Sequence, residues 1–133
     1  MWLLKTEPSA YGYADLEREG RAVWDGVKNP VALKNLRAMA VGDLAFVYHT
    51  GDEKAVVGTA RITRAPFPDP KRGDPRLVVV EIEPTGRLKR PVTLAEIKAL
   101  PAFALSPLVR QGRLSVVPLT RAQWKAVVDR AAR

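Results

Sequence analysis

Residues 44–63, LAFVYHTGDEKAVVGTARIT, contain the clearest strand pattern in the chain. Every second residue from Leu44 to Tyr48 is a large apolar side chain, which is the two-residue period of a β-strand. Turn residues follow at 50–52, and residues 54–63 resume an extended pattern. The segment therefore predicts a β-hairpin.

Other predicted elements lie on both sides of this hairpin. The expected strands are residues 2–5, 22–24, 76–83, 88–92 and 114–117. The expected helices are residues 13–19, 30–39, 94–100, 102–109 and 121–130. Residues 65–75, with four prolines and four charged residues, predict a surface loop, and residues 84–86 predict a turn. This order of elements indicates an α+β fold on a small, mostly antiparallel sheet, either open or closed into a barrel.

Capping residues indicate where three of the helices begin. Asn29 precedes Pro30, so we expect Asn29 to cap a helix whose first position is Pro30. Two capping-box patterns, each a Thr followed three residues later by Glu or Gln, begin at Thr93 and Thr120. These residues set the expected first turns of the helices.

The composition is that of an ordinary globular protein. The chain has 133 residues, 47% hydrophobic and 27% charged, which predicts one domain over residues 1–133 with a buried core. Because the sequence contains no Cys and a single His, His49, we expect no disulfide, no thiol nucleophile, no metal and no other cofactor. No apolar run is long enough to span a membrane, and Lys5 interrupts the apolar start of the chain. We therefore expect a cytoplasmic protein without a membrane segment.

The charge is basic and unevenly distributed. The chain has 22 Lys and Arg against 14 Asp and Glu, a net charge of +8. Residues 1–59 contain seven basic and eight acidic side chains, whereas residues 60–133 contain fifteen basic and six acidic ones. This asymmetry favours a polyanionic partner, with nucleic acid first. Basicity without a specific partner is the alternative.

Motifs of the common nucleotide-binding and hydrolytic enzymes are absent. The sequence contains no GxxxxGK[ST], no GxGxxG and no GxSxG. Glu81 and Glu83 lie two residues apart on one face of a predicted strand, a spacing that a paired acid–base site could use. Exposed glutamates flanked by Arg76 and Arg87 are the interpretation we favour. We expect a binding protein and not an enzyme.

Five short segments form a pattern of another kind. They are WLLKTEP (2–8), WDGVKN (24–29), VGDL (41–44), FVYH (46–49) and QGRLSV (111–116). Together they resemble the EVE domain family, which belongs to the PUA-like superfold. The similarity extends from Trp2 to about Trp124, essentially the whole chain. It implies a PUA-like pseudo-barrel of mostly antiparallel strands flanked by short helices.

The resemblance also implies a reader module without catalysis. PUA-like domains bind RNA or modified nucleobases. The resemblance to EVE domains implies a pocket for a modified cytosine in DNA, for example 5-methyl- or 5-hydroxymethylcytosine. This chain departs from the family pattern at Thr6, where relatives often carry Ser, and at Pro30, where they often carry an aromatic residue. The loop at residues 71–75 is also shorter than in many relatives. These departures bear on base preference and on any nucleic-acid contact of that loop.

A flipped base needs a flat surface, hydrogen bonds to its edge and cations for its phosphates. Trp24 and Tyr48 are the expected aromatic walls, although both are also suited to a core. Asn29 offers a donor and an acceptor, and it is equally suited to cap the following helix. The other expected pocket residues are Lys5, Thr6, His49 and Ser115.

Cationic side chains are the expected phosphate contacts, with solvated surface charge as their alternative role. They are Arg87, Lys89, Arg90, Arg110 and Arg113. The sequence is thus interpreted as a nucleic-acid reader of modified DNA, with RNA also possible as the polymer. Two alternatives remain: an RNA-binding domain that recognises shape, and a nucleoside-binding domain or small enzyme that uses the same pocket. No protein partner is indicated.

Overall fold

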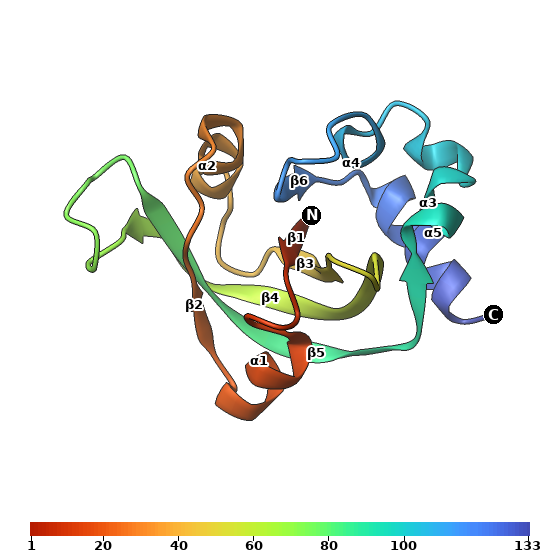
Figure 1. The fold of residues 1–133 in the computed structure, drawn as a ribbon, viewed down its shortest axis with the longest axis horizontal. Helices are drawn as coiled ribbons and strands as arrows, with labels where there is room; N and C mark the ends of the chain where they lie inside the picture. The colour runs from red at the N-terminus through yellow and green to blue at the C-terminus, as the bar shows by residue number, and fades with distance from the viewer.

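The computed structural model describes residues 1–133, which form one six-stranded sheet surrounded by short helices (Figure 1). The strands are β1 (Trp2–Thr6), β2 (Ala22–Trp24), β3 (Leu44–His49), β4 (Ala55–Pro68), β5 (Val78–Thr93) and β6 (Val116–Pro118). The helices are α1 (Tyr13–Glu19), α2 (Pro30–Arg37), α3 (Leu94–Lys98), the 3-10 helix η1 (Pro101–Phe103), α4 (Pro107–Arg110) and α5 (Arg121–Ala131). The strand order is β2-β5-β4-β3-β1-β6, and only the β1–β3 pair is parallel. The expected α+β fold is confirmed, with the sheet curved into a half-barrel.

Side-chain caps explain where the helices begin. Asn29 Oδ1 accepts hydrogen bonds from the backbone N–H groups of Val31 at 2.9 Å and Ala32 at 3.1 Å. Thr93 and Thr120 form the predicted capping boxes. These contacts satisfy N–H groups that have no partner within the helix. The helix expected at residues 102–109 is divided into η1 and α4. No helix is both long enough and apolar enough to cross a membrane.

β4 and β5 are longer than the sequence pattern predicted. Residues 65–68, expected in a loop, continue β4, and residues 84–86, expected to turn the chain, lie inside β5. Bulges allow this, because the β4–β5 register shifts at four points and Gly86 adopts a φ of +146°. The strand expected at 88–92 is therefore the second half of β5. Beyond Ile62, which forms the last backbone hydrogen bonds on the β3 side with Gly42 and Asp43, β4 is an edge, and prolines are tolerated on such an edge.

The centre of the sheet carries the core. Leu3 and Leu4 are both completely buried, so β1 is covered on both of its faces, as its continuous apolar character predicted. Phe46 of β3 is also fully buried. Its ring stacks on Trp124 of α5 with the ring centroids 3.8 Å apart. The last helix therefore covers one face of the central strands.

Tyr13, the first residue of α1, fixes that helix to the sheet. Its ring lies so close to Gly58 of β4 that a Cβ at Gly58 would stand 2.5 Å from Tyr13 Cζ. The Tyr13 hydroxyl donates to the Thr59 carbonyl at 2.7 Å and accepts from the Gly86 N–H at 3.1 Å. The side chain thus bridges β4 and β5 at the bulges that bend them.

Gly58→Ala is expected to lower the free energy of unfolding by about 1–3 kcal/mol, because a fully buried ring held by two hydrogen bonds would have to move. Urea denaturation measures this change. Gly112→Ala is the matched control, since a Cβ there meets nothing within 4 Å. Equal stability of the two variants would contradict the importance of the contact.

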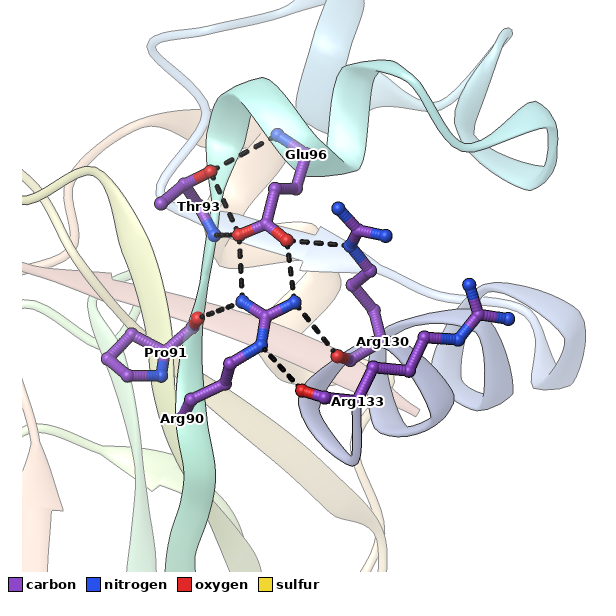
Figure 2. A network of polar contacts seen from close by, with 6 residues as sticks. All are labelled: Arg90, Pro91, Thr93, Glu96, Arg130 and Arg133. Carbon is purple, nitrogen blue, oxygen red and sulfur yellow. Dashed lines mark hydrogen bonds and ion pairs between the residues drawn. The ribbon is translucent and has the colours of Figure 1, made fainter.

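A network of polar contacts joins β5, α3 and α5 (Figure 2). The Glu96 carboxylate accepts from both terminal nitrogens of Arg90, at 3.1 and 2.8 Å, and from Arg130 Nε at 2.6 Å. Arg90 also donates to the backbone oxygens of Pro91, Arg130 and Arg133. The hydrogen bonds from Arg90, then those from Arg130 and the backbone of Thr93, hold the pKa of Glu96 far below its usual value.

Glu96→Gln is expected to lower stability at neutral pH, with an effect that fades in acid. The folded protein keeps this carboxylate charged below its ordinary pKa of 4.5, whereas the unfolded chain becomes protonated there. The stabilisation is therefore complete above that pH and is lost as the pH falls toward the lowered pKa. Thermal unfolding at pH 7 and at about pH 3 measures the difference between variant and wild type. A difference that stays constant with pH would argue against the network.

Candidate functional site

A cavity of about 500 Å³ lies where β1 ends beside β2. Four residues predicted for the base pocket line it together, namely Lys5, Thr6, Trp24 and Ser115. The other lining residues are Tyr11, Glu19, Ala22, Val23, Asp25, Gly26, Val27 and Lys71. The cavity thus combines aromatic and small apolar side chains with charges of both signs.

Trp24 forms an aromatic wall of the cavity. It is the last residue of β2, pairs with Val80 of β5 and is 7% exposed. The Tyr11 ring packs against it edge to face, with the centroids 6.1 Å apart, and the Tyr11 hydroxyl donates to Glu19 at 2.9 Å. Burial, and then this carboxylate, raise the pKa of Tyr11. The Trp24 indole N–H has no acceptor in the protein and is not completely buried, so it is free to donate to a ligand.

Lys5 brings a positive charge to the end of β1. Its backbone N–H donates to the Ser115 carbonyl at 2.9 Å, and its Nζ donates to the Gly112 carbonyl at 2.9 Å. The ammonium also lies 5.6 Å from the centroid of the Tyr48 ring. Burial lowers the pKa of Lys5. One hydrogen bond leaves two N–H groups of the ammonium available to a ligand.

Hydroxyl and carboxylate groups complete the polar lining. The Thr6 hydroxyl donates to the Tyr11 carbonyl at 2.6 Å, so its oxygen remains only as an acceptor. Ser115 has no side-chain partner in the protein and offers both a donor and an acceptor. The carboxylates of Asp25 and Glu19 add acceptors. The cavity is therefore suited to a flat molecule with both donors and acceptors on its edge.

Several of these residues were not among the predicted base-pocket residues. Asp25 directly follows Trp24 in the WDGVKN segment, and that adjacency is a signal from which it could have been found. Lys71 reaches the cavity from the connection between β4 and β5, where Asp69 Oδ1 accepts the Lys71 backbone N–H at 2.9 Å. No periodicity relates residue 71 to residue 24, so only the tertiary structure brings them together.

The structure places Asn29 outside the cavity. Its Oδ1 caps α2, which confirms one of its two predicted roles. Its side chain lines a separate recess of about 290 Å³, which Arg113 also lines.

Tyr48 and His49 also lie outside the cavity. Tyr48 is 3% exposed, packs beside Lys5, and has a pKa raised by burial. His49 Nε2 accepts the Tyr13 backbone N–H at 3.0 Å, and its Nδ1 lies 2.7 Å from a Glu53 carboxylate oxygen. Both ring nitrogens of His49 therefore have partners within the protein.

The predicted phosphate contacts divide into two groups. Arg90 is held by Glu96, and Arg87 pairs with Glu17 at 2.7 Å while lying over the Tyr13 ring. The remaining members are exposed and form no ion pair or side-chain hydrogen bond: Lys89, Arg110 and Arg113. Only this second group has its charge available to a ligand.

Glu81 and Glu83 are half-buried, not exposed as expected, and both form ion pairs with arginines. Arg21 lies 3.8 Å from Glu81 and 3.9 Å from Glu83, and Arg61 pairs with Glu83. Arg76 and Arg87, which flank the two glutamates in the sequence, pair with Asp74 and Glu17. Nowhere do three His, Cys, Asp or Glu side chains lie close enough together to hold a metal ion.

Asn29→Ala is expected to destabilise the protein by about 1 kcal/mol, whereas Asn29→Ser is expected to be nearly neutral, because Ser retains the cap of α2. Chemical denaturation of both variants measures the effect. Equal losses from Ala and Ser would show that the cap is not the main structural role of this side chain.

The curved mixed sheet, the short helices around it and the cavity at the end of β1 define a PUA-like domain, as the sequence resemblance predicted. The chain belongs to the EVE domain family, whose model matches residues 1–130.

Known proteins of this kind are similar over nearly the whole chain. A protein from Rhodopseudomonas palustris, solved by NMR, is 40% identical, with a TM-score of 0.92 over 98% of this chain and 92% of that chain. Mouse thymocyte nuclear protein 1 is 29% identical over 96% of this chain and 72% of its own length. Human thymocyte nuclear protein 1, crystallised in complex with DNA containing 5-methylcytosine, is 29% identical, with a TM-score of 0.86 over 99% of this chain and 97% of that chain.

Proposed function

We propose that this protein binds DNA and reads a modified cytosine, which enters the cavity beside Trp24 flipped out of the duplex. One observation carries the proposal: a nearly buried indole with a free N–H lines the same cavity as the Lys5 ammonium and the Asp25 carboxylate. The complex of human thymocyte nuclear protein 1 with DNA containing 5-methylcytosine supports this choice of ligand.

The polar groups of the cavity match the edge of cytosine. The pairing edge of cytosine has an amino group, which donates, and two acceptors, a ring nitrogen and a carbonyl oxygen. Asp25 is therefore suited to accept from the amino group, and Lys5 is suited to donate to an acceptor. Uracil and thymine carry a carbonyl oxygen in place of the amino group, and a carboxylate repels it. This arrangement favours cytosine over uracil and thymine.

One part of the cavity wall is apolar and is suited to contact the 5-methyl group of the base. Ala22, Val23 and Val27 line the cavity on the β2 side. A methyl group in an apolar slot contributes about 1–3 kcal/mol, so we expect a graded preference for the modified base and not an absolute selection.

The size and the aromatic wall of the cavity suit a single flipped base. A volume of about 500 Å³ lies within the range of small-molecule sites. Flipping costs a few kcal/mol, and stacking on Trp24 contributes about 1–3 kcal/mol toward it. Affinity for the polymer therefore also requires contacts to the phosphates.

Exposed cations are the proposed source of those contacts. Lys71 lines the cavity, and Arg110 and Arg113 are exposed without ion pairs. Neutralising phosphates releases counterions, so binding weakens as salt concentration rises. Arg87 and Arg90 are not included, because acidic residues of the protein already pair with them.

The proposed activity is binding without turnover. The chain contains no Cys, and its one histidine lies outside the cavity with both ring nitrogens engaged. The remaining groups of the cavity are suited to hydrogen bonding and stacking, which a reader needs.

Trp24→Ala is expected to weaken binding to a duplex with one 5-methylcytosine roughly 5- to 150-fold, because stacking contributes about 1–3 kcal/mol per base. Trp24→Phe keeps a ring but removes the N–H and is expected to be intermediate. Fluorescence anisotropy with duplexes containing cytosine, 5-methylcytosine or 5-hydroxymethylcytosine, at two salt concentrations, measures affinity and preference together.

Circular dichroism of both Trp24 variants is the control for folding. Unchanged affinity and preference in a folded Trp24→Ala variant would remove this residue from the site. Binding by the wild type that depends on salt but not on the modification would contradict the reader function. Tighter binding to RNA at the same salt concentration would favour an RNA-binding domain instead.

A further inference from the structure

Asn29 and Arg113, which lie outside the cavity, both line the smaller recess. The recess has a volume of about 290 Å³ and is lined by Asn29, Val31, Gln111, Gly112, Arg113 and Leu114. We propose that it binds the phosphate group next to the flipped nucleotide, as an anion site distinct from the base cavity. This inference rests on the proposed function of the cavity and adds the path of the DNA strand.

The recess continues the cavity along the same two segments of the chain. Residues 24–27 line the cavity and Asn29 lines the recess, while Ser115 lines the cavity and residues 111–114 line the recess. Lys5 connects the two hollows, because its Nζ donates to the Gly112 carbonyl at 2.9 Å. A strand whose base occupies the cavity therefore has its adjoining phosphate near the recess.

The recess offers hydrogen-bond donors without any acidic side chain. The Arg113 guanidinium has no ion pair or hydrogen bond in the protein, and a guanidinium matches phosphate with two parallel hydrogen bonds. Asn29 uses its Oδ1 for the cap, which leaves its Nδ2 amino group free. The Gly112 carbonyl, an acceptor that would oppose an anion, is already bound by Lys5.

Two consecutive backbone N–H groups add to this set of donors. The N–H groups of Gly112 and Arg113 have no acceptor in the protein, although their neighbours Gln111 and Leu114 both donate to backbone carbonyls. Gly112 and Arg113 lie in a turn, and consecutive free N–H groups of a turn are suited to bind an anion. The cavity, by contrast, is lined by Glu19 and Asp25, whose carboxylates repel a phosphate. The two hollows are thus suited to different parts of one nucleotide strand.

A double-mutant cycle between protein and DNA tests the inference. Each duplex contains one 5-methylcytosine, with the phosphate on its 5′ side or its 3′ side replaced by an uncharged methylphosphonate. The wild type is expected to lose about tenfold in affinity for one of these two duplexes only. For the 5-methylcytosine duplex with all phosphates intact, Arg113→Gln is expected to lose the same factor in affinity relative to the wild type. Replacing that phosphate by the methylphosphonate is expected to cost Arg113→Gln no further affinity.

Two further variants sharpen the assignment. Asn29→Ser keeps the cap of α2 but removes the amide donor, so it is expected to reduce the effect of the same methylphosphonate. Lys98→Gln removes an exposed cation on α3, which lines neither hollow, and is expected to keep the full effect.

The outcomes separate this inference from the proposed function. Wild-type affinity that falls equally for both methylphosphonates, or for neither, overturns the phosphate site, as does continued sensitivity of Arg113→Gln. Preference for 5-methylcytosine over cytosine reports on the cavity and is expected to persist in Arg113→Gln. A wild-type protein without that preference overturns the proposed function, and the phosphate site with it.

Discussion

The pairing of β1 between β3 and β6 is the interaction on which the rest of the structure depends. β1 runs parallel to β3 and antiparallel to β6, so it joins the central hairpin to the C-terminal part of the chain. Parallel strands cannot be connected by a tight turn, and the chain between β1 and β3 therefore has to cross over. That crossover contains α1, β2 and α2. It carries Trp24 to the position where it faces the end of β1.

The candidate site lies where β1 ends, at Lys5 and Thr6. Lys5 is held between the Ser115 carbonyl and the Gly112 carbonyl, and its partial burial disfavours the charged form. Trp24 is almost fully buried and yet keeps a free N–H. Groups of this kind, partly buried and with unused hydrogen-bonding capacity, are typical of binding sites.

Much of the fold could be predicted from local sequence, because local interactions determine it. The hairpin at residues 44–63 and the caps at Asn29, Thr93 and Thr120 follow from periodicity and from side chains that bind backbone within three residues. The bends of β4 and β5 could not be predicted, since Pro and Gly occur both at bulges within strands and in turns that end them. The ring of Tyr13 against Gly58 distinguishes the two cases, and that contact joins distant segments.

The sequence by itself determined the family, the order of the elements, the basic charge and four of the residues that line the cavity. Only the tertiary structure decided which charges are available, because Glu96 lies on α3 and Glu17 on α1, and their pairing with Arg90 and Arg87 depends on how these helices pack. It also decided that Lys71 joins the cavity and that Asn29 and Arg113 share a recess. The physical reason is that hydrogen bonds and ion pairs act over a few ångströms, and the distance between two side chains far apart in the sequence is set by the fold alone.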